Sequence, residues 1–145
     1  MEEVKVAEMI ATLAHIDQVD KGGNPYIEHP RAVSRLVTTD LEKTVAWLHD
    51  VVEDTFVTLE DLKRVGFSDV VVMAVDAITR RYNESREDYL ERVIRNPIAV
   101  MVKLADLTNN ADLTRIENPT DKDRERTQKY IKEIEWINNK MDEVI

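Results

Sequence analysis

The sequence is most informative at residues 47–54, which read Trp47-Leu48-His49-Asp50-Val51-Val52-Glu53-Asp54. An α-helix turns by about 100° per residue, so apolar and polar side chains at this spacing separate onto opposite arcs. The apolar arc holds Trp47, Leu48, Val51 and Val52, and the polar arc holds His49, Asp50, Glu53 and Asp54. The pattern predicts a helix with one face in the core and one polar face that contains a His-Asp pair.

The polar arc carries three carboxylates and no lysine or arginine. Like charges at this spacing repel, and the dipole at a helix C-terminus disfavours anions, each by about 0.3–1 kcal/mol. Because both effects have the same sign, a bound cation would compensate them. A solvated acidic face with an unrelated histidine explains these residues equally well, so the stretch alone leaves both interpretations open.

The rest of the chain shows helical spacing, helix caps and few turn residues. Thr39 with Glu42 and Thr58 with Asp61 have the spacing of a capping box. The predicted helices cover residues 2–18, 30–38, 39–54, a short stretch after 58, 69–79, 85–95, 97–112 and 120–143. No alternating strand pattern competes outside residues 70–73. The sequence therefore predicts an all-α fold, a compact bundle of helices that forms one domain over residues 1–145.

Composition excludes several classes of protein. A net charge of −9 argues against nucleic-acid binding and against an anionic membrane as partner. No apolar run approaches the roughly 18 residues of a transmembrane helix. The acidic N-terminus does not resemble a signal peptide, and the absence of cysteine excludes disulfides and thiolate metal sites. We expect a cytoplasmic protein, and a homo-oligomer is compatible with the sequence.

Two further positions suggest a metal site. His29 lies near the end of a loop at residues 20–30, directly before a helix predicted to begin at Pro30. Histidine is the commonest metal ligand. A histidine that bonds to the backbone at a helix end is the alternative. Asp106 interrupts an apolar helix and shares a face with Lys103 and Asn110, although a surface ion pair between Lys103 and Asp106 would explain it too.

Together these positions supply nitrogen and oxygen ligands without sulfur: His29, His49, Asp50 and Asp106. Mixed imidazole and carboxylate ligation suits Mn²⁺, Fe²⁺ or Zn²⁺. Whether the four side chains converge is a question for the structure.

Longer strings resemble a known family. They are AHIDQVDKGGNPYIEHP at 14–30, AWLHDVVEDT at 46–55, the pair Thr79-Arg80, and VKLADLTNN at 102–110. Their combination resembles the hydrolase domain of the RelA/SpoT alarmone enzymes, within the HD phosphohydrolase superfamily, and especially its small single-domain relatives. The resemblance covers residues 14–113 approximately and is more specific than any of the strings alone.

The resemblance implies a helical HD-domain bundle that removes pyrophosphate from the 3′ position of ppGpp or pppGpp with Mn²⁺. It implies His29, His49, Asp50 and Asp106 as metal ligands, and Glu53 and Asp54 in water activation and proton transfer. It also implies that Asn110 and Lys21 contact a small-molecule nucleotide substrate. Lys103 and Arg80 are further candidates to offset phosphate charge.

The chain also departs from the family pattern. Asp20 stands where an arginine usually precedes the lysine, and Leu107, Thr108 and Asn109 replace Arg-Leu-His. We expect both departures to affect the surroundings of the nucleotide and not the metal, so the reaction type is better supported than the substrate. A synthetase domain has no room in 145 residues. Two alternatives stay open: a metal-dependent hydrolase of another nucleotide or phosphate ester, and a nucleotide-sensing module without turnover.

Overall fold

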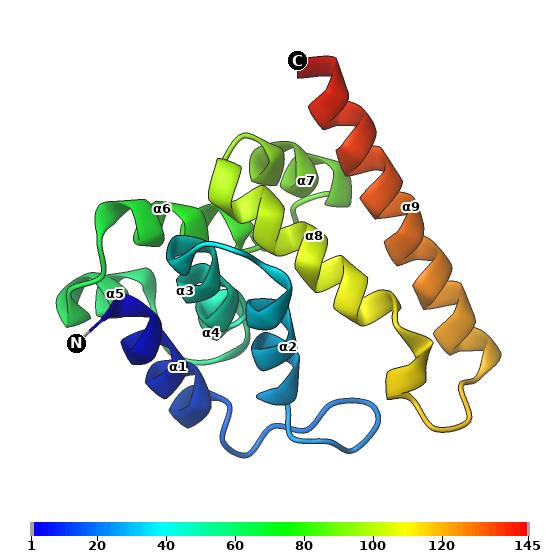
Figure 1. The fold of residues 1–145 in the computed structure, drawn as a ribbon, viewed down its shortest axis with the longest axis horizontal. Helices are drawn as coiled ribbons and strands as arrows, with labels where there is room; N and C mark the ends of the chain where they lie inside the picture. Colours follow the sequence, from blue (N-terminus) through cyan, green and yellow to red (C-terminus); the bar gives the residue numbers. More distant parts are fainter. Residues whose placement is uncertain (1, 145) are drawn as a thin grey trace.

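Helix α3 (Asp40–Leu48) lies at the centre of the fold, and a computed structural model describes residues 2–144 (Figure 1). It packs against α1, α2, α6 and α8, and its second half, residues 44–48, is buried. The other elements are α1 (Glu3–Ala14), α2 (Glu28–Leu36), α4 (Val51–Asp54), α5 (Leu59–Val65), α6 (Asp69–Ile78), α7 (Arg86–Ile94), α8 (Pro97–Ala111), the 3-10 helix η1 (Leu113–Arg115) and α9 (Asp121–Val144). The all-α prediction is confirmed, since residues 2–144 hold no strand beyond one isolated bridge between Val19 and Pro25.

Local capping sets most of the helix starts at the predicted residues. The Thr39 hydroxyl accepts the Glu42 N–H, and the Glu42 carboxylate accepts the Thr39 N–H, both at 3.1 Å. Thr58 and Asp61 form the same reciprocal pair at the start of α5. These bonds satisfy backbone donors that the first turn of a helix leaves free.

The prediction that Pro30 begins a helix is wrong, because α2 begins at Glu28. The first four N–H groups of a helix have no partner within it, so a proline is tolerated anywhere in the first turn. His29 therefore lies in the first turn of α2 instead of the preceding loop. The first helix ends at Ala14, before the predicted residue 18, and the chain then folds into a tight loop in which the Tyr26 N–H donates to the Gln18 carbonyl at 2.8 Å.

The predicted helix 39–54 is interrupted at His49 and Asp50, between α3 and α4. Nδ1 of His49 donates to the carbonyl oxygen of Ala46 at 2.6 Å. In a continuous helix that oxygen would accept from the N–H of Asp50. The side chain thus competes with the backbone at the point where the helix breaks.

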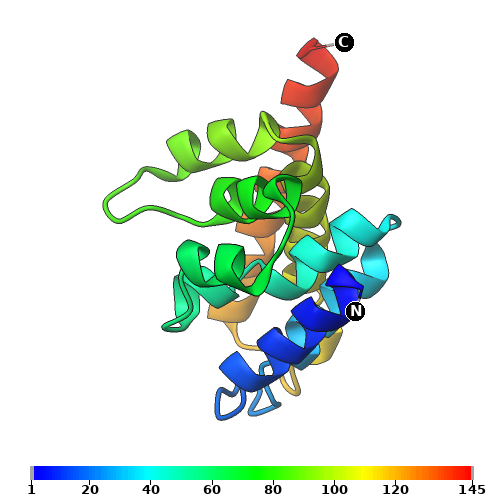
Figure 2. The same ribbon diagram turned by 90° about the vertical axis from the view of Figure 1, so that its left-hand side faces the viewer.

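The long helix α9 runs beside α8 along one side of the molecule (Figures 1 and 2). The loop after α1 and the segment before α9 lie at the same end of the bundle in both views. This arrangement brings chain segments about a hundred residues apart to the mouth of one cleft. Between residues 2 and 144 no helix is long and apolar enough to cross a membrane.

Candidate active site

A cleft of about 710 Å³ opens between the loop after α1, the break between α3 and α4, α8, and α9. It is lined by all the site residues predicted from the sequence except His49, namely Lys21, His29, Asp50, Glu53, Asp54, Arg80, Lys103, Asp106 and Asn110. His49 lies behind this wall and is 3% exposed. The fold therefore brings residues from four separated segments to one surface.

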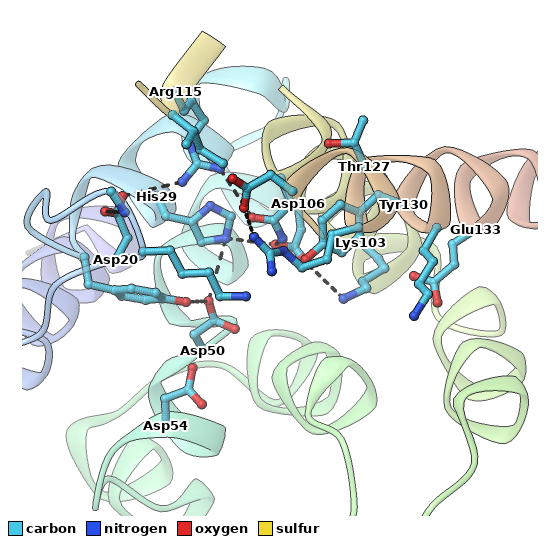
Figure 3. Close-up of a pocket in the computed structure, with 18 of the residues that line it drawn as sticks. Asp20, His29, Asp50, Asp54, Lys103, Asp106, Arg115, Thr127, Tyr130 and Glu133 are labelled. Atoms are coloured by element: carbon cyan, nitrogen blue, oxygen red, sulfur yellow. Dashed lines mark hydrogen bonds and ion pairs between the residues drawn. The ribbon is translucent and has the colours of Figure 1, made fainter. Parts of the chain in front are cut away.

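Ligand atoms of His29, His49 and Asp50 lie close enough together to hold one metal ion, and Asp106 lies beside both histidines. Figure 3 shows His29, Asp50 and Asp106 at the floor of the cleft. Oδ1 of Asp106 lies 2.8 Å from Nε2 of His29 and 3.4 Å from Nε2 of His49. Oδ2 of Asp50 lies 3.1 Å from Nε2 of His49. Ligands about 2.1 Å from one ion in tetrahedral or octahedral geometry are themselves about 3.0–3.4 Å apart. Nε2 of His29 and Oδ2 of Asp50 lie 3.8 Å apart, so the four printed separations run from 2.8 to 3.8 Å, around the values expected for a shared cation.

Both imidazole rings are held by a hydrogen bond at Nδ1, so Nε2 faces the carboxylates. Nδ1 of His29 donates to Oδ1 of Asn109 at 2.7 Å, and Nδ1 of His49 donates to the Ala46 carbonyl. Nε2 of His49 is buried and has no hydrogen-bond partner among the described residues. Nε2 of His29 lies 2.8 Å from Oδ1 of Asp106. A ring held through Nδ1 is oriented so that Nε2 can bind a metal. The donor set therefore fits a divalent ion.

Electrostatics at the floor of the cleft also favour a cation. Burial acts to raise the pKa of Asp50, but the neighbouring His49 lowers it to about 2. Burial acts on Asp106 in the same way, and the charge of Lys103 holds its pKa well below the ordinary value. Burial lowers the pKa of His49, whereas the charge of Asp50 raises it well above the ordinary value. Two ionised carboxylates in a buried site require positive partners.

Lys103 and Asp106 form an ion pair at 2.8 Å, but not at the surface, since they are 7% and 5% exposed. The Lys103 ammonium also lies 5.2 Å from the centre of the Tyr89 ring. The Asn110 amide donates to Oδ1 of Asp106 at 3.1 Å. The predicted shared face of α8 is thus confirmed, and Lys103 binds Oδ2 of Asp106 while Oδ1 faces the histidines.

Glu53 and Asp54 lie beside Asp50, and each offers an oxygen within 4.8 Å of the others. Oε1 of Glu53 accepts the backbone N–H of Arg80 at 2.9 Å, while the Arg80 guanidinium donates to the Glu84 carbonyl at 3.2 Å. Burial, followed by the charges of Asp50 and Glu53, raises the pKa of Asp54 to about 6. One carboxyl of the pair is therefore partly protonated near neutral pH.

Two contacts at the floor of the cleft were missed by the sequence reasoning. The hydroxyl of Tyr26 donates to Oδ2 of Asp50. Asn109 was expected to affect the surroundings of a nucleotide and not the metal, but its Oδ1 accepts from Nδ1 of His29, one of the predicted ligands. Both residues stand within the strings quoted above.

The wall contributed by α7, η1 and α9 was also missed. Its lining residues are Arg86, Arg115, Ile116, Asp123, Arg126, Thr127, Lys129, Tyr130 and Glu133. Figure 3 shows Thr127, Tyr130 and Glu133 along α9, across the cleft from Asp50. Arg86 donates two hydrogen bonds to Glu133, at 2.6 and 2.8 Å, which ties α7 to α9. No local pattern in the sequence signals that α9 faces the histidines.

Comparison with known proteins finds no matching family model. The chain is 36% identical over 117 residues to the guanosine-3′,5′-bis(diphosphate) 3′-pyrophosphohydrolase of Haemophilus influenzae and 34% identical over 125 residues to that of Vibrio cholerae. It is also 34% identical over 123 residues to a GTP pyrophosphokinase of Streptomyces coelicolor. The alignments cover 70–76% of this chain. The chain spans only 14–18% of the length of these relatives.

Among solved structures, the chain matches one described as a metazoan orthologue of SpoT that hydrolyses ppGpp. The TM-score is 0.74 at 25% sequence identity, and the match covers 92% of this chain and 84% of the other. The similarity extends over almost the whole fold.

Proposed function

We propose, from the premise that this chain is a RelA/SpoT hydrolase-like HD-domain protein, that it is a metal-dependent phosphohydrolase. The substrate that best fits its relatives is guanosine tetra- or pentaphosphate, from which it would remove the 3′-pyrophosphate. The observation that carries the proposal is the buried, unpartnered Nε2 of His49, aimed at the carboxylates of Asp50 and Asp106. One domain over residues 1–145 would suffice for this reaction.

His29, His49, Asp50 and Asp106 would hold the ion, and we propose Mn²⁺, which accepts mixed nitrogen and oxygen ligands. A divalent ion bound there supplies a Lewis acid that polarises a phosphoryl oxygen and lowers the pKa of water towards neutrality. Asn109 and the Ala46 carbonyl fix the ring tautomers, and Lys103 and Asn110 fix the orientation of Asp106. The chain thus orients its ligands from outside the cluster.

Glu53 and Asp54 would move the protons. In the proposed reaction, the oxygen of a water molecule attacks the phosphorus that is bonded to the 3′ oxygen. The bond between this phosphorus and the 3′ oxygen then breaks. Glu53, fixed by the Arg80 N–H, would accept the proton of the water. Asp54, whose pKa is raised to about 6, would donate a proton to the departing 3′ oxygen.

Cations around the cleft would receive the phosphates. Lys21 lies on the loop after α1, Arg80 follows α6, and both line the cleft. Asn110 would contact the nucleotide while it holds Asp106. Lys103 would act mainly through its ion pair with Asp106, since its ammonium is already engaged.

The test incubates the protein with ppGpp and Mn²⁺ and follows GDP and pyrophosphate. Asp50→Asn and Glu53→Ala should each lower turnover by at least a hundredfold, and a chelator should abolish it. Asp142→Asn, at an exposed position near the end of α9, is the matched control and should leave turnover unchanged. Bound Mn²⁺ without turnover of ppGpp would move the proposal to another phosphate ester. Binding of ppGpp without any turnover would favour a nucleotide sensor.

A further inference from the structure

Arg115, the last residue of η1, bridges two walls of the cleft. Its Nη1 donates to the carbonyl oxygen of Asn109 at 3.0 Å and lies 3.5 Å from Oδ1 of Asn110, at the end of α8. Its Nη2 lies 3.7 Å from Oδ2 of Asp20, on the loop after α1. Figure 3 shows Asp20 and Arg115 on the same side of the cleft, next to His29. The guanidinium therefore stands at the rim above the proposed metal ligands.

Asp20 is anchored by its own loop. Its Oδ1 accepts the backbone N–H groups of Gly22 and Asn24, both at 2.9 Å. These bonds fix the carboxylate, so that Oδ2 is directed towards Arg115. Asp20 departs from the family pattern, and the sequence left this departure unexplained. In the structure Asp20 pairs with Arg115 on the other wall of the cleft.

Arg115 differs from the other arginines of the cleft in how firmly it is paired. Arg86 makes a bidentate pair with Glu133, and Arg126 contacts Asp123 directly. Arg115 meets its carboxylate only at 3.7 Å, beyond hydrogen-bond range. A guanidinium has five N–H donors, and the carbonyl of Asn109 takes one of them at a normal distance. Donors remain for an anion in the cleft.

Resting on the proposed function, we propose that Arg115 binds a phosphate group of the substrate and that Asp20 is the positioning residue that aims it. Arginine binds phosphate through paired N–H donors, and a loosely held guanidinium can turn to make that contact. The negative charge of Asp20 is offset by Arg115 and not by Lys21. The positive charge of Lys21 is therefore available for a second contact with the phosphates. The specificity of this cleft then depends on a cation supplied by η1.

A purely structural role for Arg115 makes a different prediction. Arg115 contacts Asn109 and Asn110, and these residues bond His29 and Asp106. If Arg115 only supported α8, its loss would lower kcat and the affinity for Mn²⁺. If it binds phosphate, its loss would raise KM and weaken the binding of a free phosphate compound, with the metal affinity unchanged.

The experiment compares wild type with Arg115→Met, Arg115→Lys, Asp20→Asn and the double variant Asp20→Asn/Arg115→Met. Binding of inorganic pyrophosphate is measured by calorimetry at a fixed concentration of free Mn²⁺, and kcat and KM are measured with ppGpp. The matched control is Arg124→Met, because Arg124 pairs with Asp121 on α9 but does not line the cleft.

Arg115→Met should weaken pyrophosphate binding and raise KM by tenfold or more, with kcat changed by less than threefold. Arg115→Lys should recover part of the loss. Asp20→Asn should weaken binding about threefold in the presence of Arg115. In the Arg115→Met background, Asp20→Asn should not weaken binding, because its only effect there is to remove a negative charge from the cleft.

Three results would overturn the inference: unchanged pyrophosphate binding in Arg115→Met, a loss confined to kcat or Mn²⁺ affinity, or tighter binding in Asp20→Asn alone. The calorimetric result does not depend on turnover. If wild type binds pyrophosphate through Arg115 but does not hydrolyse ppGpp, the proposed substrate fails and the phosphate-binding role stands. If wild type turns over ppGpp but Arg115→Met behaves as wild type, the proposed substrate stands and the phosphate-binding role of Arg115 fails.

Discussion

Tyr26 shows how a single side chain outside the proposed ligand set can control it. Its hydroxyl donates to Oδ2 of Asp50, the oxygen that faces Nε2 of His49 at 3.1 Å. Burial, together with the charge of Asp50, raises the pKa of Tyr26 above its ordinary value, so the hydroxyl stays a donor at all working pH values. Hydrogen bonds of this kind orient metal-binding carboxylates.

We predict that Tyr26→Phe lowers the affinity for Mn²⁺ by about tenfold, since loss of such an outer contact typically costs 10- to 100-fold. Calorimetric titration with Mn²⁺ measures the change. Tyr82→Phe is the control, because Tyr82 is 94% exposed and lies outside the cleft lining. Equal affinities in the two variants would show that Tyr26 does not orient Asp50.

The same residues explain what the sequence could predict about the site. Histidine and aspartate are common metal ligands, and His49 and Asp50 are adjacent. The candidate ligands could therefore be predicted from residue type and spacing. The contacts made by Tyr26 and Asn109 depend on side-chain rotamers and on the packing of α2 against α8. Such contacts leave no periodic signal.

At the scale of elements, capped helix starts were predictable, whereas the start of α2, the end of α1 and the break after Leu48 were not. The capping boxes at Thr39 and Thr58 involve residues within one turn, so the printed spacing contains the whole interaction. The break after Leu48 depends on the His49 ring reaching a backbone carbonyl. An ordinary helical pattern continues through residues 49–54, which is why a single helix was expected there.

Helix α8 carries a buried ion pair whose burial the sequence could not reveal. The spacing placed Lys103 and Asp106 one turn apart, but the packing of α3 and α9 against α8 decides that the pair is buried. Breaking a buried pair by removing one partner leaves an uncompensated charge and costs about 3–5 kcal/mol. The same i, i+3 geometry on an exposed helix is worth about 0–1 kcal/mol.

We therefore predict that Lys103→Met lowers the free energy of unfolding by about 3 kcal/mol or more at pH 7. Lys63→Met is the matched control, since Lys63 and Glu60 form an exposed i, i+3 pair on α5, and it should cost less than about 1 kcal/mol. Urea denaturation in the presence of a chelator measures both. Equal losses would mean that burial does not strengthen the dependence on Lys103.

The loss of unfolding free energy in Lys103→Met should also depend on pH. In wild type the pKa of Asp106 lies well below its unfolded value of about 3.9, so its contribution is complete above that value and is lost as the pH falls further. Without Lys103, burial raises the pKa of Asp106, and protonation relieves the buried charge. The difference between the variant and wild type should therefore be largest at neutral pH and shrink as the pH approaches 4.

At the scale of the whole molecule, the cleft exists only because α9 returns along α8 to face the segments around His29 and Asp50 (Figures 1 and 3). The sequence predicted α9 and its start but not the face that it covers, because its cleft-lining residues alternate with ordinary charged surface residues. The cleft-lining residues of α9 were missed for this reason. The unfolded chain has no such arrangement.

This difference between the folded and unfolded chain leads to a prediction about stability. A ligand that binds only the native state stabilises it by about 2.7 kcal/mol at a concentration of a hundred times its Kd. For a domain of this size, 1 kcal/mol shifts Tm by about 2–4 °C. Mn²⁺ at that concentration should therefore raise Tm by about 5–10 °C, and Asp50→Asn should abolish most of the shift while Asp142→Asn keeps it. Thermal unfolding followed by circular dichroism, with and without a chelator, measures the shift. A Tm that does not respond to Mn²⁺ in wild type, or a full shift in Asp50→Asn, would mean that the ion does not bind at the cluster of His29, His49, Asp50 and Asp106.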